Sequence, residues 1–141
     1  MNTNVHRGTA LITGASSGIG AVYADRLARS GYDLILVARR EDRLRALATQ
    51  LTDRTGRSVE ILPADLTNPA GLAKVEEVLK TDASITMFVN NAGIASTAPL
   101  LASDIDQMER MIALNVNVPT RLAYAVAPAL VARGTGTIVN I

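Results

Sequence analysis

The sequence contains no cysteine and only one histidine, His6. The absence of cysteine excludes disulfides, thiol nucleophiles and cysteine-ligated zinc, and a single histidine excludes a metal site built from several histidines. Aromatic residues make up only 3% of the sequence, whereas hydrophobic residues make up 48%, so Ala, Val, Leu and Ile must form the core. This balance favours a helix-covered parallel sheet over a β-sandwich.

The sequence also lacks an excess of either charge, because 14 basic residues are balanced by 13 acidic ones. A net charge of +1 gives no electrostatic reason to expect a nucleic acid or an anionic membrane as a partner. No apolar run approaches the roughly 20 residues of a membrane span, and the sequence begins with polar residues. We therefore expect a soluble cytoplasmic protein without a metal site.

Short apolar runs rich in strand-forming residues recur along the chain, and each precedes a stretch with helical periodicity. The length of 141 residues suits one domain. Apolar side chains three and four positions apart mark one face of each helix. The repeat predicts parallel strands joined by right-handed helical crossovers. The four expected strands are 9–13, 33–38, 59–63 and 85–90.

Helix boundaries are indicated by capping residues. Gly56 stands where the second helix should end, and Asn68 followed by Pro69 should begin the third. Ser103 or Asp104 can cap a fourth helix.

The last part of the chain differs in spacing from the rest. Residues 104–133 form one long helical stretch in which Pro119 and Pro128 should produce bends. The run 136–141, GTIVNI, is then expected to be a fifth strand.

A glycine-rich turn, TGASSGIG at 13–20, lies between the first strand and the first helix. It could be an ordinary turn, but at this place the N–H groups of a helix start favour an anion. Gly14 permits the tight turn, Gly18 lets a diphosphate approach the backbone, and Gly20 lets the helix pack close to the strand. Ser16 and Ser17 can add hydroxyl donors.

Four motifs in order resemble the classical type of the short-chain dehydrogenase/reductase family, from about residue 7 to residue 141. They are TGASSGIG, the Asp65-Leu66 pair after the third strand, NNAG at 90–93, and Asn115 within the fourth helix. The resemblance implies a nicotinamide-dependent oxidoreductase with a Rossmann-like, doubly wound α/β fold. Its parallel sheet would have the strand order 3-2-1-4-5 and stop after the fifth strand.

The resemblance also implies a set of cofactor-binding residues and one catalytic residue. Asp65 would bind the adenine amino group, although it could instead be a helix-initiating carboxylate. Asn90 should stabilise the sheet more than it contacts a ligand. Asn115 would hold a catalytic water, or could be a polar residue at a kink. The full cofactor-binding set is Gly14, Ser16, Ser17, Gly18, Ile19, Gly20, Arg39, Arg40, Asp65, Leu66, Asn91, Ala92 and Gly93.

The end of the second strand indicates which nicotinamide cofactor is bound. An acidic residue there would bind the ribose hydroxyls of NAD, but this sequence has Arg39 with Arg40 behind it. A guanidinium can hold a 2′-phosphate with two charge-assisted hydrogen bonds. We therefore expect NADP(H), the alternative being two solvated arginines at a helix start.

The catalytic pair that the family requires, a tyrosine with a lysine four residues later, is missing from the 141 residues. Four positions after Tyr23, Tyr32 and Tyr124 stand Leu27, Leu36 and Pro128. We therefore expect 1–141 to be the NADP-binding portion of a longer oxidoreductase, inactive by itself, whose catalytic C-terminal portion is absent.

A dinucleotide-type turn of this kind is compatible with three functions. The first is NADP(H)-dependent hydride transfer at the carbonyl or alcohol carbon of a small molecule, performed by a parent protein that we expect to be a homo-oligomer. The second is a non-catalytic dinucleotide-binding module, such as a sensor or scaffold. The third, a methyltransferase with a nucleoside cofactor, is disfavoured by NNAG and Asn115. An apolar edge at the fifth strand predicts poor solubility for the isolated chain.

Overall fold

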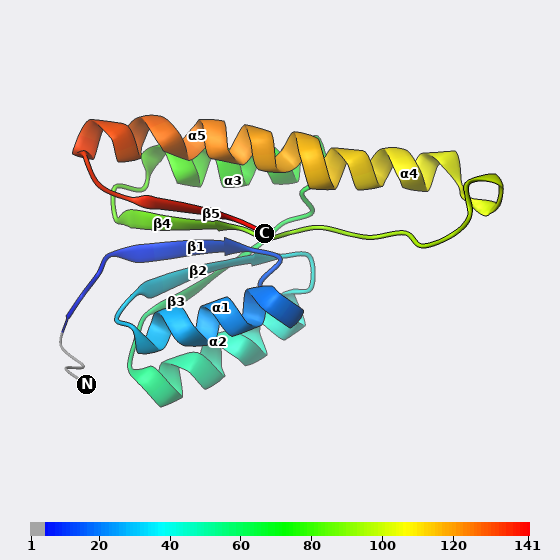
Figure 1. The fold of residues 1–141 in the computed structure, drawn as a ribbon. Helices are drawn as coiled ribbons and strands as arrows, with labels where there is room; N and C mark the ends of the chain where they lie inside the picture. Colours follow the sequence, from blue (N-terminus) through cyan, green and yellow to red (C-terminus); the bar gives the residue numbers. More distant parts are fainter. Residues whose placement is uncertain (1–4) are drawn as a thin grey trace.

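A computed structural model describes residues 5–141, which form a five-stranded parallel sheet covered by helices on both faces (Figure 1). The order β3-β2-β1-β4-β5 confirms the expected Rossmann-like, doubly wound fold. The first four residues, part of the polar start of the sequence, lie outside the described residues. The strands are β1 (Thr9–Thr13), β2 (Asp33–Ala38), β3 (Val59–Pro63), β4 (Ile85–Asn90) and β5 (Thr137–Asn140).

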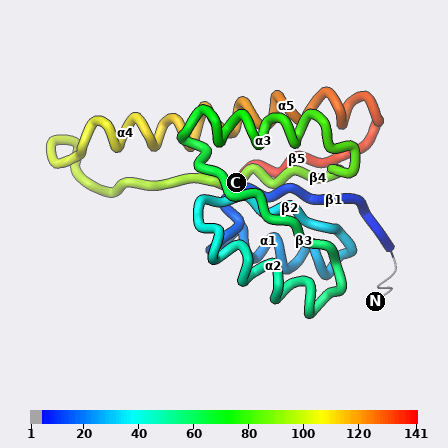
Figure 2. Tube along the Cα trace, turned by 180° about the vertical axis from the view of Figure 1, so that it is seen from behind, coloured from blue at the N-terminus to red at the C-terminus, as the bar shows by residue number. Residues whose placement is uncertain are grey.

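The helices lie in two layers. On one face of the sheet are α1 (Gly18–Arg29) and α2 (Glu41–Thr55), and on the other are α3 (Pro69–Thr81) and α5 (Val118–Arg133) (Figures 1 and 2). All four strand pairings are parallel. The strands therefore begin along one side of the sheet, here called the amino edge, and end along the other, the carboxyl edge.

Two apolar cores, one on each face, explain why the strands are almost continuously hydrophobic. Leu11 and Phe88 point into the core under α3 and α5, whereas Ile12 and Leu36 point into the core under α1 and α2. All four side chains are fully buried. Alternate residues of one strand thus face opposite cores, as expected for a parallel sheet covered on both sides.

Helix boundaries follow the expected capping residues. The Asn68 side chain accepts a hydrogen bond from the Ala70 N–H (2.9 Å), and Asp104 rather than Ser103 caps α4 (Ile105–Ile112). Gly56 ends α2 in the left-handed conformation, with φ of 68°.

The long helical stretch is interrupted at one place, next to the first of the two prolines where bends were expected. A π-helical turn, η2 (Ala113–Asn117), joins α4 to α5 immediately before Pro119. Pro119 lacks the N–H that an α-helix would direct to the Asn115 carbonyl, so a widened turn fits this position. Pro128 instead lies inside α5, which continues through it without interruption. The rod formed by α4, η2 and α5 projects past the carboxyl edge (Figure 1).

Among residues 5–141, no helix is long and apolar enough to cross a membrane.

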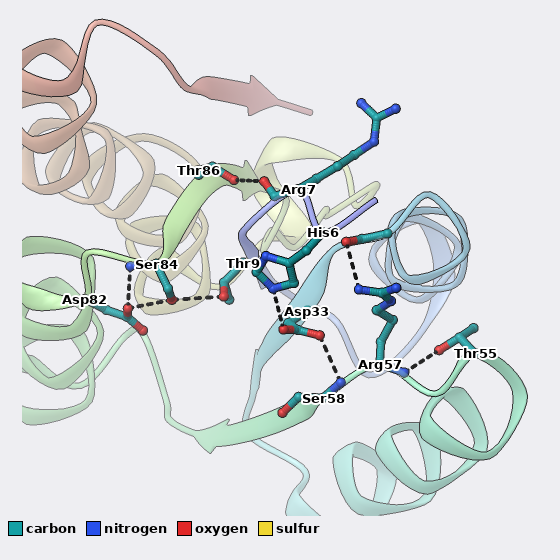
Figure 3. Close-up of polar contacts among 11 residues, drawn as sticks. His6, Arg7, Thr9, Asp33, Thr55, Arg57, Ser58, Asp82, Ser84 and Thr86 are labelled. Atoms are coloured by element: carbon teal, nitrogen blue, oxygen red, sulfur yellow. Dashed lines mark hydrogen bonds and ion pairs between the residues drawn. The ribbon is translucent and has the colours of Figure 1, made fainter. Parts of the chain in front are cut away.

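At the amino edge, polar side chains bond to one another (Figure 3). The His6 ring lies 2.8 Å from the Asp33 carboxylate, which also accepts a hydrogen bond from the Ser58 N–H (3.0 Å). The Ser84 hydroxyl lies 2.6 Å from Asp82 and 2.9 Å from the hydroxyl of Thr9. These residues line a hollow of about 230 Å³.

Candidate functional site

The glycine-rich turn lies at the carboxyl edge, between β1 and α1. A hydrogen bond from the Ala15 N–H to the Val37 carbonyl (3.1 Å) ties the turn to β2. A Cβ atom at Gly20 would collide with the carbonyl oxygen of Gly14, so α1 can start this close to the turn only because glycine stands there. The structure thus supports the packing role expected of Gly20.

The N-terminus of α1 has free donor capacity. Ser17 occupies the N-cap position without a side-chain hydrogen bond, and the first turn contains no acidic residue. In contrast, α3 and α4 are capped by Asn68 and Asp104. The first N–H groups of a helix have no partner within it, and their dipoles favour an anion.

Space for such an anion exists beside Gly18. Its φ is 55°, and a Cβ atom built there would meet nothing within 4 Å. Ser17, Gly18 and Ile19 are exposed, and Ser16 is half-buried. The turn and helix start therefore present backbone N–H groups to solvent at this edge.

Behind the turn, Thr13 and Asn91 connect β1 to the end of β4. The buried Thr13 hydroxyl accepts hydrogen bonds from the N–H groups of Asn91 (3.0 Å) and Ala92 (3.1 Å). The Asn91 amide donates to the carbonyls of Thr13 (3.1 Å) and Gly14 (3.3 Å). The Asn91 side chain therefore shapes the turn from inside the protein, while Gly93 is exposed at the rim.

Asn90 has a different function from its neighbour. Its amide donates to the Pro119 carbonyl (2.9 Å) and to the Asn140 side chain (3.1 Å). It thereby links β4 to α5 and β5, in agreement with the expectation that Asn90 would stabilise the sheet.

Two arginines follow β2, and they have different surroundings. Arg40 makes a two-pronged contact with Asp42, with Nε 3.1 Å from Oδ1 and Nη2 2.7 Å from Oδ2. This hydrogen bonding lowers the pKa of Asp42 to about 2. Arg39 is exposed and makes no hydrogen bond or ion pair with any residue in the described part of the chain.

Asp65 follows β3 at the same edge as the arginines. Its Oδ1 accepts hydrogen bonds from the N–H of Thr67 (2.9 Å) and from its hydroxyl (2.7 Å). These bonds, followed by the nearby charge of Arg39, hold the pKa of Asp65 below its usual value. Asn68 rather than Asp65 caps α3. Because its pKa is lowered, Asp65 is ionised at neutral pH, and it lies near Arg39.

Leu66 belongs to the apolar core, where its side chain is buried. Any contact of Leu66 with a ligand must therefore be made by its backbone.

Asn115 lies in η2, above the segment that follows β4. Its Oδ1 accepts a hydrogen bond from the Ile94 N–H (3.0 Å), and its Nδ2 donates to the Ile94 carbonyl (2.7 Å). The amide thus fastens the projecting rod to the carboxyl edge, and the structure places Asn115 next to Gly93. This contact agrees with the reading of Asn115 as a polar residue at a helix irregularity.

The expected site residues therefore gather along one edge, apart from the Leu66 side chain. Thr13 and Asp42 were not anticipated as parts of this site. A threonine at the end of an otherwise apolar strand, and an acid two positions after an arginine, are the sequence signals that could have indicated them. Within residues 5–141 there is no group of three or more His, Cys, Asp or Glu side chains arranged to hold a metal ion.

Comparison with known proteins gives matches along nearly the whole chain. A model of the short chain dehydrogenase family matches residues 8–141. A fatty acyl-CoA reductase of Mycobacterium tuberculosis is 38% identical over 135 residues, which are 93% of this chain and 45% of that protein.

Two solved structures are similar in sequence as well as in fold. A short-chain dehydrogenase from Sphingobium yanoikuyae in complex with NADPH is 56% identical, with a TM-score of 0.92 over 94% of this chain and 52% of that one. A bulky-bulky ketone specific alcohol dehydrogenase from Comamonas testosteroni is 44% identical, with a TM-score of 0.94. The match covers 96% of this chain and 55% of that one. The chain spans about half the length of these relatives.

Proposed function

The chain belongs to the short-chain dehydrogenase family, and from this premise we propose that it supplies the NADP(H) site of an oxidoreductase. The parent protein would transfer a hydride to or from the carbonyl or alcohol carbon of a small molecule. The observation that carries the proposal is the uncapped start of α1, open beside Gly18, at the same edge as the unpaired Arg39.

The geometry of the turn suits a diphosphate. Backbone N–H groups at Ser17 to Gly20 can donate to it, and Gly18 leaves room for close approach. No acidic residue in the first turn of α1 opposes a negative charge.

Arg39 and Asp65 would hold the adenosine half of the cofactor. The Arg39 guanidinium is free to pair with a 2′-phosphate, and the ionised Asp65 can accept a hydrogen bond from the adenine amino group. The similar dehydrogenase from Sphingobium yanoikuyae was solved with NADPH, which supports the phosphorylated cofactor.

The bound nicotinamide would supply or accept the hydride, while this chain binds and orients the cofactor. The 141 residues contain no tyrosine followed four positions later by lysine, so we assign proton transfer to groups outside this sequence. Asn115 would keep η2 and the segment after β4 in place beside the cofactor site.

We also propose that the parent protein self-associates through α4 and α5. Exposed apolar side chains along this rod are Ile105, Ile112, Val116, Tyr124 and Val131. Sedimentation of the parent protein tests this, and a monomer at micromolar concentration would contradict it.

Titration of the chain with NADPH and NADH, followed by cofactor fluorescence, tests the cofactor assignment. The chain contains no tryptophan that would overlap with this signal. We expect tighter binding of NADPH. Arg39→Asp should weaken NADPH binding by about tenfold or more and leave NADH binding nearly unchanged, because two charge-assisted hydrogen bonds are replaced by repulsion.

Arg7→Asp is the matched control, because it makes the same charge change at the exposed amino edge. It should leave the ratio of the two affinities unchanged. An unchanged ratio in Arg39→Asp as well would show that Arg39 does not read the 2′-phosphate.

A further inference from the structure

The two arginines after β2 are adjacent in sequence, yet only one of them is paired. Asp42 faces the Nε and Nη2 atoms of Arg40 with both carboxylate oxygens (3.1 and 2.7 Å). A phosphate oxygen pair would use the same fork of N–H groups. Asp42 is therefore already in the place that a phosphate would take on Arg40.

The neighbouring first-turn acid does something different. Glu41 pairs with Arg45, one helical turn further along α2. Of the two acids at the start of α2, only Asp42 pairs with an arginine at the strand end.

We propose that Asp42 competes with the 2′-phosphate of the cofactor for Arg40, so that Arg39 alone reads the phosphate. In this view Asp42 is a specificity-determining residue that limits the preference for NADP(H) over NAD(H). The inference rests on the proposed function, because it concerns the same nucleotide site.

The expected effect is moderate because the pair is exposed. The Arg40 and Asp42 side chains are 59% and 65% exposed, and exposed ion pairs exchange readily with water and ions. Asp42→Asn should release Arg40 and remove a negative charge near the phosphate. We expect NADPH to bind about two- to fivefold more tightly at low ionic strength, with NADH binding unchanged.

The double variant Arg40→Ala/Asp42→Asn identifies the group responsible. If the pair is neutralised internally, removing both members should return NADPH affinity to the wild-type value. If Arg40 contacts the phosphate in spite of Asp42, the double variant should bind NADPH more weakly than wild type, and the proposal is overturned.

Two single variants control for charge. Glu41→Gln also removes one negative charge from the first turn of α2, but it releases Arg45 instead of Arg40. Asp53→Asn removes one negative charge near the other end of α2. Both should leave NADPH affinity within about a factor of two of wild type. If Glu41→Gln raised NADPH affinity as much as Asp42→Asn does, the gain would come from the loss of any nearby negative charge and not from the release of Arg40. That result would overturn the proposal.

The two levels of inference fail differently in these titrations. If the wild-type chain binds neither nucleotide, the proposed function falls and this inference falls with it. If wild type prefers NADPH and Asp42→Asn is indistinguishable from it, only the role of Asp42 is wrong.

Discussion

At the amino edge of the sheet, Asp33 and Ser84 are engaged by neighbouring polar groups, with His6 and Asp82 as their partners (Figure 3). At the carboxyl edge, Thr13 and Asn91 also bond internally, but their partners are the backbone groups that shape the glycine-rich turn. At the amino edge, the polar groups therefore form hydrogen bonds with one another. The carboxyl edge uses the buried Thr13 and the half-buried Asn91 to fix the backbone of the turn.

This difference shows that a hollow is a weaker sign of a binding site than a set of available donors. The amino edge has a hollow of about 230 Å³, yet the polar side chains lining it include partnered ones such as Asp33 and Ser84. The start of α1 has no side-chain cap and no first-turn acid. A ligand at the amino edge would have to break existing hydrogen bonds, whereas an anion at the carboxyl edge would complete missing ones.

The largest expected effect comes from adding a side chain at Gly20, where two backbone segments of the carboxyl edge lie close together. Gly20→Ala places a methyl group against the carbonyl oxygen of Gly14, which is backbone and cannot move cheaply. We expect a loss of about 3 kcal/mol in the free energy of unfolding, measured by urea denaturation. Gly56→Ala is the control: nothing lies within 4 Å of its Cβ position, so only the left-handed conformation opposes it, at about 1 kcal/mol. Equal losses in the two variants would contradict the packing role of Gly20.

Thr9 and Thr13 lie at opposite ends of β1, so the stability lost on replacing each one compares the two edges directly. Thr13→Val removes the acceptor for two part-buried N–H groups, those of Asn91 and Ala92, and should destabilise the chain by about 2 kcal/mol. The one hydrogen bond that the Thr9 hydroxyl makes with the described residues is to the Ser84 hydroxyl, so Thr9→Val should cost less than about 1 kcal/mol. Urea denaturation of both variants checks this, and a larger loss at Thr9 would reverse the comparison.

A smaller effect on stability, but a selective one on binding, is expected at Gly18. Gly18→Ala should lose about 1 kcal/mol of stability from its positive φ. Its methyl group would project into the space open to the diphosphate, and we expect NADPH affinity to fall by about tenfold. Gly134→Ala has a similar φ of 68° and open space far from the turn, so it should share the stability loss but keep the affinity. Unchanged binding in Gly18→Ala would place the diphosphate elsewhere.

The smallest effect is expected from charge at the amino edge. Burial raises the pKa of Asp33, but hydrogen bonds from His6 and from the Ser58 N–H outweigh it, so the pKa lies below its usual value. The stabilisation is therefore complete above the unfolded pKa of about 3.9 and is lost as the pH falls through the lower folded value. Asp33→Asn should reduce the loss of stability between neutral and acidic pH by less than about 1 kcal/mol. Urea midpoints at the two pH values measure this, and an identical pH dependence in wild type and variant would contradict it.

Much of the fold could be predicted because the signals are local. The runs 9–13, 33–38, 59–63 and 85–90 are mostly apolar, since both faces of the sheet are covered, and the observed strands have these bounds. The cap at Asn68 and the left-handed Gly56 also depend only on neighbouring residues. The expected strand at 136–141 is shorter in the structure, where β5 spans Thr137–Asn140.

The details of the site were less predictable because they depend on contacts between distant residues. Thr13 bonds to the backbone of Asn91, which is 78 positions away, and no local pattern indicates that pairing. The pairing of Arg40 with Asp42 depends on the side-chain rotamers that the strand end allows. Pro119 indicated an irregularity near 113–117, but the hydrogen bonds between the Asn115 amide and the Ile94 backbone join residues 21 positions apart and have no local signal.

The internal hydrogen bonds of the glycine-rich turn bear on the entropy of ligand capture. Ala15 is fastened to β2 and Gly14 to Asn91, so the loop already has its final shape when the chain folds. A dinucleotide bound at the proposed site would then not have to immobilise this segment, and little of its contact energy would be lost to ordering. We therefore expect association at the proposed site to be limited by encounter and not by rearrangement of this loop.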